Sequence, residues 1–120
     1  MDQLVECLNC SLVYVNPRLD TERIEDAYME AVDPFHADQD YWRIRSFERA
    51  LNRIFGKRPS SHDRSDRKSL LDIGCASGAF LVAARRHGFE VTGVEPSRYL
   101  SDRGRARYNV RVVQGTLRDA

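Results

Sequence analysis

Residues 69–81 read SLLDIGCASGAFL, and this stretch decides the fold. A short apolar run, with a charged segment before it and a glycine after it, is typical of a strand buried in a parallel sheet. Gly74 and Gly78 then bracket a tight turn that opens a helix, with Ser77 as the expected N-cap. Asp72 interrupts the apolar run near the carboxyl end of the strand. Because a buried carboxylate needs hydrogen-bond donors and open α/β sheets bind ligands at that end, we expect a ligand to face the turn.

A second strand is expected at residues 89–95, about twenty residues after the turn, as in a dinucleotide-type βαβ unit. It ends in Glu95, which is placed to accept hydrogen bonds from both hydroxyls of a ribose. Pro96 then ends the strand, and Ser97 is placed to cap the next helix. The other elements expected in this half of the chain are helices at 78–87 and 97–108 and a third strand at 110–113.

Residues 72–78 (DIGCASG) and 93–97 (GVEPS) resemble the first two cofactor motifs of class I S-adenosylmethionine-dependent methyltransferases. The resemblance extends from residue 68 to about residue 117, with Ala76 at a position where the family often has a glycine. It implies an α/β, Rossmann-like fold of which this chain supplies the N-terminal half. The family sheet has the strand order 3-2-1-4-5-7-6, so we expect parallel strands in the order 3-2-1 with their helices, preceded by a helical segment.

The same resemblance implies how S-adenosylmethionine would bind as the cofactor. The loop at 74–78 would lie against its methionine and ribose, with Asp72 supporting that end, and Glu95 would hold the ribose hydroxyls. Residues 114–117 would flank the adenine, where the family commonly has an acidic residue and this chain has Thr116. The cofactor-binding residues implied are Asp72, Gly74, Cys75, Ala76, Gly78, Glu95, Pro96, Gly115, Thr116 and Leu117. No catalytic residue is named, because the family takes any general base from later strands.

The composition and charge of the chain exclude some classes of binding partner. The sequence has 19 Lys and Arg residues against 18 Asp and Glu residues, a net charge of +1, so we expect no nucleic acid as partner. No apolar run approaches the roughly 18 to 20 residues that a membrane span needs, so we expect no membrane as partner either. The resemblance to methyltransferases implies a small-molecule substrate. The 3 cysteines, without the core of a signal peptide, indicate reduced thiols and a cytoplasmic protein.

Cys7 and Cys10 have the spacing of half a tetrahedral zinc site. Many bacterial methyltransferases of the type that this chain resembles carry a four-cysteine knuckle near the N-terminus, and here the first pair is missing. Two thiolates cannot complete the shell of the metal, and neither His36 nor His62 has a ligand spacing to the pair. We therefore expect no metal, and a vestigial knuckle whose residues 12–15 pack as a short strand.

Two helices are expected before the first strand of the sheet, at 20–29 and 40–55, from apolar residues at three- and four-residue intervals. In the family such helices cover the cofactor, so the candidates for a lid are Tyr28, His36, Tyr41 and Trp42. The alternative is that they belong to the core, as aromatic residues on a helical stripe more commonly do. The expected organisation is a partial knuckle at 1–19, a helical cap or lid at 20–56, a linker at 57–67 and a cofactor-binding half-domain at 68–120.

The absence of the later strands has a structural consequence. The strand at 70–73 would lie at an edge of the sheet, and the helices would all cover one face. The other face, lined by residues such as Leu71, Ile73, Val91 and Val94, is too apolar to be left in water. We therefore expect a homodimer or a separate chain that completes the sheet.

Three functions remain open from the sequence. The first is the cofactor lobe of a methyltransferase that acts on a small molecule once a partner completes it. The second is a non-catalytic oligomerisation or binding module derived from such an enzyme. The third is a nicotinamide-nucleotide-binding domain, which Glu95 also favours, although Ala76 replaces the middle glycine of the Gly-x-Gly-x-x-Gly pattern. Cys75 is expected to pack in the turn, since no base accompanies it as a nucleophile.

Overall fold

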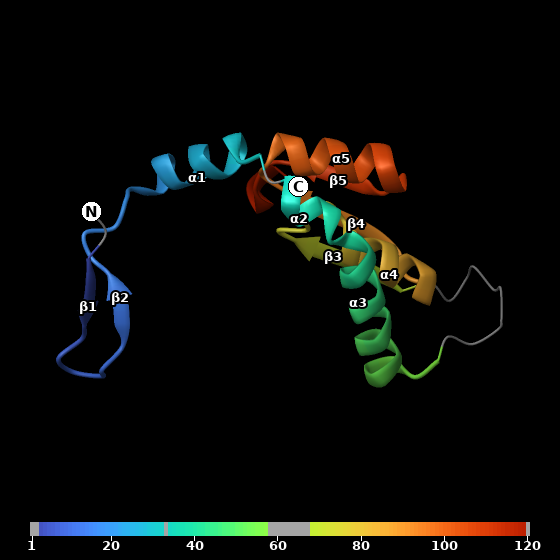
Figure 1. Cartoon of the computed structure of the whole chain (residues 1–120), viewed down its shortest axis with the longest axis horizontal. Helices are drawn as coiled ribbons and strands as arrows, with labels where there is room; N and C mark the ends of the chain where they lie inside the picture. The colour runs from blue at the N-terminus through green and yellow to red at the C-terminus, as the bar shows by residue number, and fades with distance from the viewer. Residues whose placement is uncertain (1–2, 33, 58–67, 120) are drawn as a thin grey trace.

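The computed structural model describes residues 3–32, 34–57 and 68–119. Of the expected linker at 57–67, all but Lys57 lies outside the described residues. The elements, in chain order, are β1 (Leu4–Glu6), β2 (Val13–Val15), α1 (Thr21–Glu30), α2 (Pro34–Asp38), α3 (Asp40–Phe55), β3 (Ser69–Ile73), α4 (Ala79–His87), β4 (Glu90–Glu95), α5 (Arg98–Tyr108), β5 (Arg111–Gln114) and the 3-10 helix η2 (Leu117–Asp119) (Figure 1).

A parallel sheet of three strands, in the order β3-β4-β5, contributes to the buried core of the chain. The expected α/β class and strand order are therefore confirmed. The register pairs Leu70 with Val91 and Ile73 with Val94, so the carboxyl ends of β3 and β4 reach the same edge. In the described part of the chain no strand pairs with the outer side of β3, which lies at the edge of the sheet as expected.

Helices α4 and α5 pack on one face of this sheet, and α3 packs against α4. The buried core joins Ile44 and Leu51 of α3 to Leu81 of α4 and to Val91 and Val112 of the strands. Alternation along the strands places Gly93 on the same face. It lies so close to α4 that an added Cβ would be 2.7 Å from Leu81 Cδ1. On α5, the corresponding Cβ of Gly104 would be 3.6 Å from Val112 Cγ2.

The opposite face is partly bare. Leu71 and Ile73 of β3 are 51% and 58% exposed there. The expectation was wrong for Val91 and Val94, because both are buried. Val91 pairs with Leu70 and faces the helices, whereas Val94 lies between Ile73 and Val113 across the sheet. The uncovered apolar surface is therefore concentrated on the edge strand β3.

The N-terminal segment extends away from the sheet (Figure 1). Strands β1 and β2 form an antiparallel hairpin at one end of the molecule, and α1 connects it to the rest. The radius of gyration is 17.6 Å, whereas a compact domain of this length has about 14 Å. Leu12 and Val13 are 62% and 58% exposed, so the expected packing of residues 12–15 was wrong. The strand itself exists, but it pairs with β1 and covers no core.

Most helix ends follow the local sequence. Asp20 caps α1 by accepting from the backbone N–H of Arg23 at 2.9 Å, and Ser97 caps α5 by accepting from that of Leu100 at 3.2 Å. Gly56 and Gly88 end α3 and α4 with positive φ angles. Helix α2 is an addition that the sequence pattern did not predict, and it begins at a proline, which is favoured at the first helical position.

Candidate functional site

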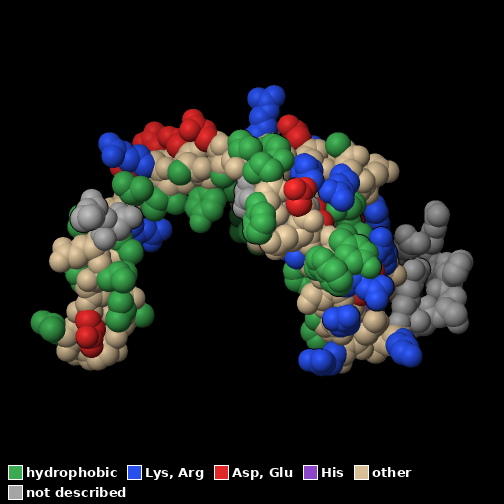
Figure 2. Space-filling model, viewed as in Figure 1, with side chains coloured by type: hydrophobic (Ala, Val, Ile, Leu, Met, Phe, Trp, Pro, Cys, Tyr) green, Lys and Arg blue, Asp and Glu red, His purple; other side chains and the backbone are tan. Residues whose placement is uncertain are grey.

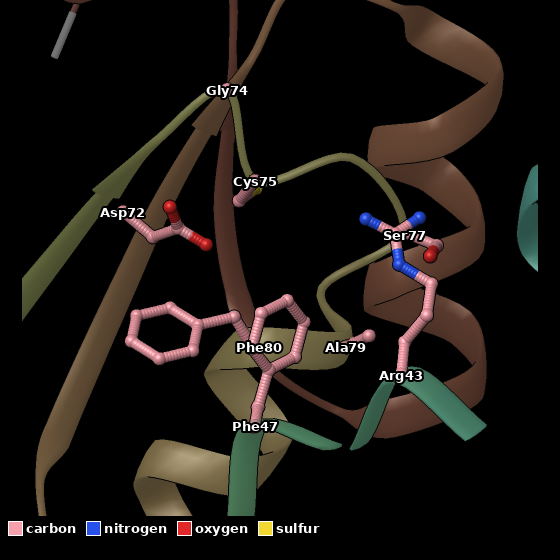
Figure 3. Close-up of a pocket in the computed structure, with 8 residues that line it drawn as sticks. All are labelled: Arg43, Phe47, Asp72, Gly74, Cys75, Ser77, Ala79 and Phe80. Atoms are coloured by element: carbon pink, nitrogen blue, oxygen red, sulfur yellow. The ribbon is translucent and has the colours of Figure 1, made fainter. Parts of the chain in front are cut away.

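A cavity of about 230 Å³ opens at the carboxyl end of β3, between α3 and α4 (Figure 3). Its lining includes three of the predicted cofactor-binding residues, Asp72, Gly74 and Cys75. The turn after β3 and the first residues of α4 form one wall, and the N-terminal half of α3 forms another. The other lining residues are Arg43, Phe47, Ser77, Ala79 and Phe80.

Two opposite charges enter the cavity from different elements. Asp72 comes from β3 and Arg43 from α3 (Figure 3). Burial raises the pKa of Asp72 above its usual value, and the negative charge of Glu95 raises it further, whereas the positive charge of Arg43 opposes this shift. A ligand group that carries a cation close to an anion would match this arrangement, because each charge would gain an opposite partner.

The apolar wall of the cavity consists of two aromatic rings. Phe47 of α3 and Phe80 of α4 meet edge to face, with their ring centroids 5.1 Å apart. This contact joins the helix that precedes the sheet to the helix that follows the turn. The cavity is therefore charged on the side of Asp72 and Arg43 and apolar on the side of the rings, as sites for small amphiphilic ligands generally are.

Glu95 holds the turn from the end of β4. It is 6% exposed, and its Oε2 accepts a hydrogen bond from the backbone N–H of Ala76 at 2.8 Å. Its Oε1 accepts from the N–H of Ser97 at 2.9 Å. A carboxylate oxygen can accept a second hydrogen bond, so both oxygens keep capacity for the hydroxyls of a ligand. The predicted turn residues and the predicted acidic residue thus lie together, with Pro96 half-buried beside them.

The turn itself uses left-handed backbone conformations. Gly74 and Gly78 have φ angles of 77° and 84°, and Ala76 between them has a φ of 48°. Such a conformation strains a residue that has a Cβ by about 1–2 kcal/mol. Ala76 is therefore held in a geometry that suits the glycine that the family often has there, and its N–H is the one that Glu95 binds.

Ser77 has a different role from the predicted one. The N-cap of α4 is Gly78, without a side-chain hydrogen bond. The Ser77 hydroxyl instead donates to Asp40 Oδ1 at 2.5 Å. Because this partner lies 37 residues earlier in the sequence, local capping preference could not reveal it.

Cys75 packs in the turn, as expected. It is 5% exposed, and a Cβ on Gly93 would lie 2.5 Å from its Sγ, so the two residues fit against each other. Burial raises the pKa of the thiol to about 12, and the negative charges of Asp72 and Glu95 contribute to this shift. Since the thiolate is the nucleophilic form, Cys75 is poorly suited to covalent chemistry.

The segment predicted to flank an adenine lies next to Glu95 but does not line the cavity. The N–H of Gly115 donates to the Glu95 carbonyl at 3.0 Å, and Leu117 is exposed. Thr116 donates to Asp119 Oδ2 from its N–H at 2.7 Å and from its hydroxyl at 3.0 Å. These two bonds lower the pKa of Asp119, which therefore places a carboxylate beside Thr116. No motif in the sequence pointed to Asp119.

The helices before the sheet contribute to the site through residues that no sequence motif indicated. Arg43 and Phe47 line the cavity, whereas the aromatic candidates for a lid do not. Tyr41 and Trp42 are 61% and 72% exposed, and Tyr28 on α1 is 61% exposed, so these side chains do not belong to the core, and their role in a lid stays a prediction. The side chain of the fourth candidate, His36, lies outside the description.

Cys7 and Cys10 lie in the turn of the β1–β2 hairpin. The Cys7 N–H donates to the Leu12 carbonyl at 2.9 Å, and the N–H of Ser11 donates to the Cys7 carbonyl at 2.9 Å. Among the residues that the structure describes, no group of three or more His, Cys, Asp or Glu side chains could hold a metal ion. His62, which the sequence analysis considered, is outside the description.

Comparison with known proteins gives the family. Residues 29–117 match the family described as Methyltransferase domain, which is more than half of the chain. The chain belongs to this family. The match includes α3, the turn after β3, Glu95 and β5. The resemblance that the two sequence motifs indicated is therefore confirmed.

Solved structures of methyltransferases are also similar to this chain. A SAM-dependent methyltransferase from Archaeoglobus fulgidus is 21% identical, with a TM-score of 0.45, over 69% of this chain and 35% of its own length. Geranyl diphosphate C-methyltransferase from Streptomyces coelicolor A3(2), in complex with Mg²⁺, geranyl diphosphate and S-adenosyl-L-homocysteine, is 24% identical, with a TM-score of 0.46, over 79% of this chain and 38% of its own. The chain thus spans less than two fifths of either protein. No curated protein matches it.

Proposed function

We propose that this chain is the S-adenosylmethionine-binding lobe of a methyltransferase, and that it takes part in methyl transfer to a small-molecule acceptor when the rest of the sheet is supplied. The observation that carries the proposal is the cavity at the carboxyl end of β3, which places Asp72 and Arg43 beside the turn that Glu95 holds. The family of the chain supports the same cofactor.

The charges of the cavity suit the amino-acid end of this cofactor. Its ammonium group would pair with Asp72 and its carboxylate with Arg43, which are the two opposite charges in the lining. The aromatic pair of Phe47 and Phe80 would contact the apolar part of the methionine chain. Such a zwitterion neutralises both protein charges at once.

Glu95 would bind the ribose. Both of its oxygens already accept a backbone N–H, so the carboxylate is fixed in position before a ligand arrives. A pre-positioned acceptor loses little entropy on binding. S-adenosylmethionine, when bound, supplies a sulfonium methyl group for in-line attack, and the residues of this chain hold and orient it.

Calorimetric titration of the full chain with S-adenosylhomocysteine tests the proposal. We expect saturable binding by the wild type and a loss of at least about tenfold in affinity for Glu95→Ala, because hydrogen bonds to a charged group contribute about 1.5–3 kcal/mol each. Glu90→Ala is the matched control, since Glu90 is an exposed glutamate at the opposite end of β4, and its affinity should equal that of the wild type. A folded wild type that does not bind would contradict the proposal.

The nicotinamide alternative is tested in the same experiment. NADH carries two riboses but no amino acid, so it cannot pair with both Asp72 and Arg43. We expect no measurable heat of binding with NADH. Tighter binding of NADH than of S-adenosylhomocysteine would favour the alternative function.

We also propose that a second copy of this chain, or a separate chain, completes the sheet at β3. Leu71 and Ile73 are more than half exposed on this edge strand, and an unpaired apolar edge favours pairing with another strand. Light scattering at micromolar concentration should therefore show a dimer, or a monomer that associates with the completing chain. A well-folded monomer that associates with nothing would contradict this proposal.

The same exposed edge favours the second candidate, a non-catalytic binding module. It predicts association through β3 without binding of the cofactor, so the titration and the scattering experiment together separate the two functions.

In the described residues no helix is long and apolar enough to cross a membrane. We propose a cytoplasmic location, because the buried free thiol of Cys75 suits a reducing compartment.

A further inference from the structure

Asp40, the first residue of α3, is completely buried. Its Oδ1 accepts a hydrogen bond from the Ser77 hydroxyl at 2.5 Å, and its Oδ2 accepts one from the Tyr108 hydroxyl at 2.8 Å. Ser77 belongs to the turn after β3, and Tyr108 is the last residue of α5. One carboxylate thus joins three segments that are far apart in the sequence.

Burial of the Asp40 carboxylate costs free energy, which suggests that the residue has a role other than packing. A buried carboxylate loses its hydration, and an apolar residue of similar size would commonly stabilise the fold as well or better. The contact also uses the Ser77 hydroxyl, which would otherwise be available to cap α4. The turn is held tightly on the other side too, because a Cβ on Gly104 would lie 3.0 Å from the Ser77 carbonyl oxygen. Ser77 is therefore fixed between α3 and α5.

The position of Asp40 on α3 links this contact to the cavity. Arg43 and Phe47 follow it by three and seven residues, a spacing that places all three on the same side of a helix. Both residues line the cavity opposite the turn and β3 (Figure 3). Fixing the start of α3 to Ser77 therefore fixes the backbone that carries Arg43 relative to the turn and to β3.

We infer that Asp40 is a positioning residue, which holds the helix that carries Arg43 against the turn, so that Arg43 and Asp72 face the same α-amino-acid group of the ligand. The inference rests on the proposed function, and it assigns to Asp40 an effect on one end of the ligand. The adenosine end would be held by Glu95, whose oxygens accept from the backbone N–H groups of Ala76 and Ser97 and from no residue of α3. Loss of the Asp40–Ser77 hydrogen bond should therefore weaken recognition of the amino acid and leave recognition of the nucleoside.

The test compares two ligands on the full chain. S-adenosylhomocysteine carries the amino acid, and 5′-methylthioadenosine carries the same thioether and nucleoside without it. For Asp40→Ala and for Ser77→Ala, which both remove the hydrogen bond between these residues, we expect the affinity for S-adenosylhomocysteine to fall at least fivefold, with the affinity for 5′-methylthioadenosine within twofold of wild type. Tyr108→Phe is the control, because it removes the other hydrogen bond of Asp40 and leaves the bond to the turn. Its preference between the ligands should equal that of the wild type.

The outcomes separate this inference from the proposed function. An equal loss of affinity for both ligands in Ser77→Ala would show a merely structural role and would overturn the inference alone. If Asp40→Ala does not fold, Ser77→Ala decides, since it removes only a hydroxyl group. If the folded wild type binds neither ligand, the proposed function fails and the inference fails with it.

Discussion

Three carboxylates near the turn after β3 have different surroundings, and these differences suit different roles. Asp40 accepts hydrogen bonds from two side-chain hydroxyl groups and is completely buried. Glu95 accepts from two backbone N–H groups and keeps its remaining acceptor capacity. Asp72 faces the cavity, and burial raises its pKa. Asp72 is therefore the carboxylate that gains most from a cationic ligand group.

This reasoning predicts the effect of Asp72→Asn. The pKa of Asp72 is raised in the folded protein, so the folded state binds a proton more readily than the unfolded state. The free energy of unfolding of the wild type therefore falls as the pH rises through the raised pKa and Asp72 ionises. We expect Asp72→Asn to be more stable than the wild type at pH 7, and the difference should shrink below about pH 4. Urea unfolding across this pH range measures it.

The same variant should bind S-adenosylhomocysteine about tenfold or more weakly, since a charge-assisted hydrogen bond is lost. Asp26→Asn, an exposed aspartate on α1, should change neither quantity. If Asp72→Asn is instead less stable than the wild type at pH 7, and this deficit is smaller at pH 4, the ionised carboxylate stabilises the fold. That result would contradict the raised pKa of Asp72.

The cysteines give a second prediction at this scale. The pKa of Cys75 is about 12, whereas backbone N–H groups of Asn9 and Cys10 lower the pKa of Cys7 below its usual value. Because only the thiolate reacts, iodoacetamide at pH 8 should modify Cys7 more than about 100-fold faster than Cys75. Mass spectrometry of the peptides gives both rates. Comparable rates in the folded protein would mean that the turn opens and exposes Cys75.

Helices and strands of the sheet domain could be predicted from the sequence, because their signals are local. The apolar run before Gly74, the glycine stops and the Ser97 cap all depend on neighbouring residues. Strand β1 and helix α2 were missed, because three and five residues are too few to show a period.

Part of the site could be predicted for the same reason, and part could not. The turn, Asp72 and Glu95 belong to two continuous motifs. Arg43 could not be recognised, because it is one of several arginines on α3, and its contact with the cavity depends on how that helix docks. The prediction that Ser77 caps α4 was wrong, because its hydroxyl donates instead to the carboxylate of Asp40, which is distant in the sequence.

A substitution at Ser97, the N-cap of α5, tests how firmly the N-terminal segment is joined to the sheet domain. Ser97 accepts from Leu100 and also donates to the Ala31 carbonyl at 2.7 Å, beyond the end of α1. Ser97→Ala should lower the free energy of unfolding by about 1–2 kcal/mol, because a cap is lost and a carbonyl loses its donor. Asp20→Ala removes a cap from α1, which has no buried residues, and should leave the midpoint of urea unfolding unchanged. Equal losses would show that α1 unfolds together with the sheet.

The whole molecule consists of a sheet domain, covered by helices on one face, and an extended N-terminal segment (Figure 1). Apolar side chains also reach the surface along α1 and α3 (Figure 2), among them Tyr28, Tyr41 and Trp42. The strand order could be anticipated from the family resemblance, whereas the extension of the hairpin could not. Its strands are too short and too exposed for their packing to be encoded in a pattern.

Removal of residues 1–19 tests this organisation. The hairpin lies at the far end of the molecule and its strands are mostly exposed, so it adds little buried area to the sheet domain. We expect the shortened chain to melt within about 2 °C of the full chain, since a change of 1 kcal/mol would shift a domain of this size by about 4 °C or more. Far-UV circular dichroism measures the transition. A decrease above about 5 °C would show that the hairpin stabilises the sheet domain.

The most direct test of the central claim is a ¹H–¹⁵N NMR titration of the full chain with S-adenosylhomocysteine. The account predicts that the amide signals of the turn at 74–78 and of residues 95–97 shift to saturation, while those of the hairpin at 4–15 stay in place. Signals of Arg43 and Phe47 on α3 should move with the turn, because these residues line the same cavity. A well-dispersed spectrum without changes, or with changes confined to the hairpin, would contradict the account.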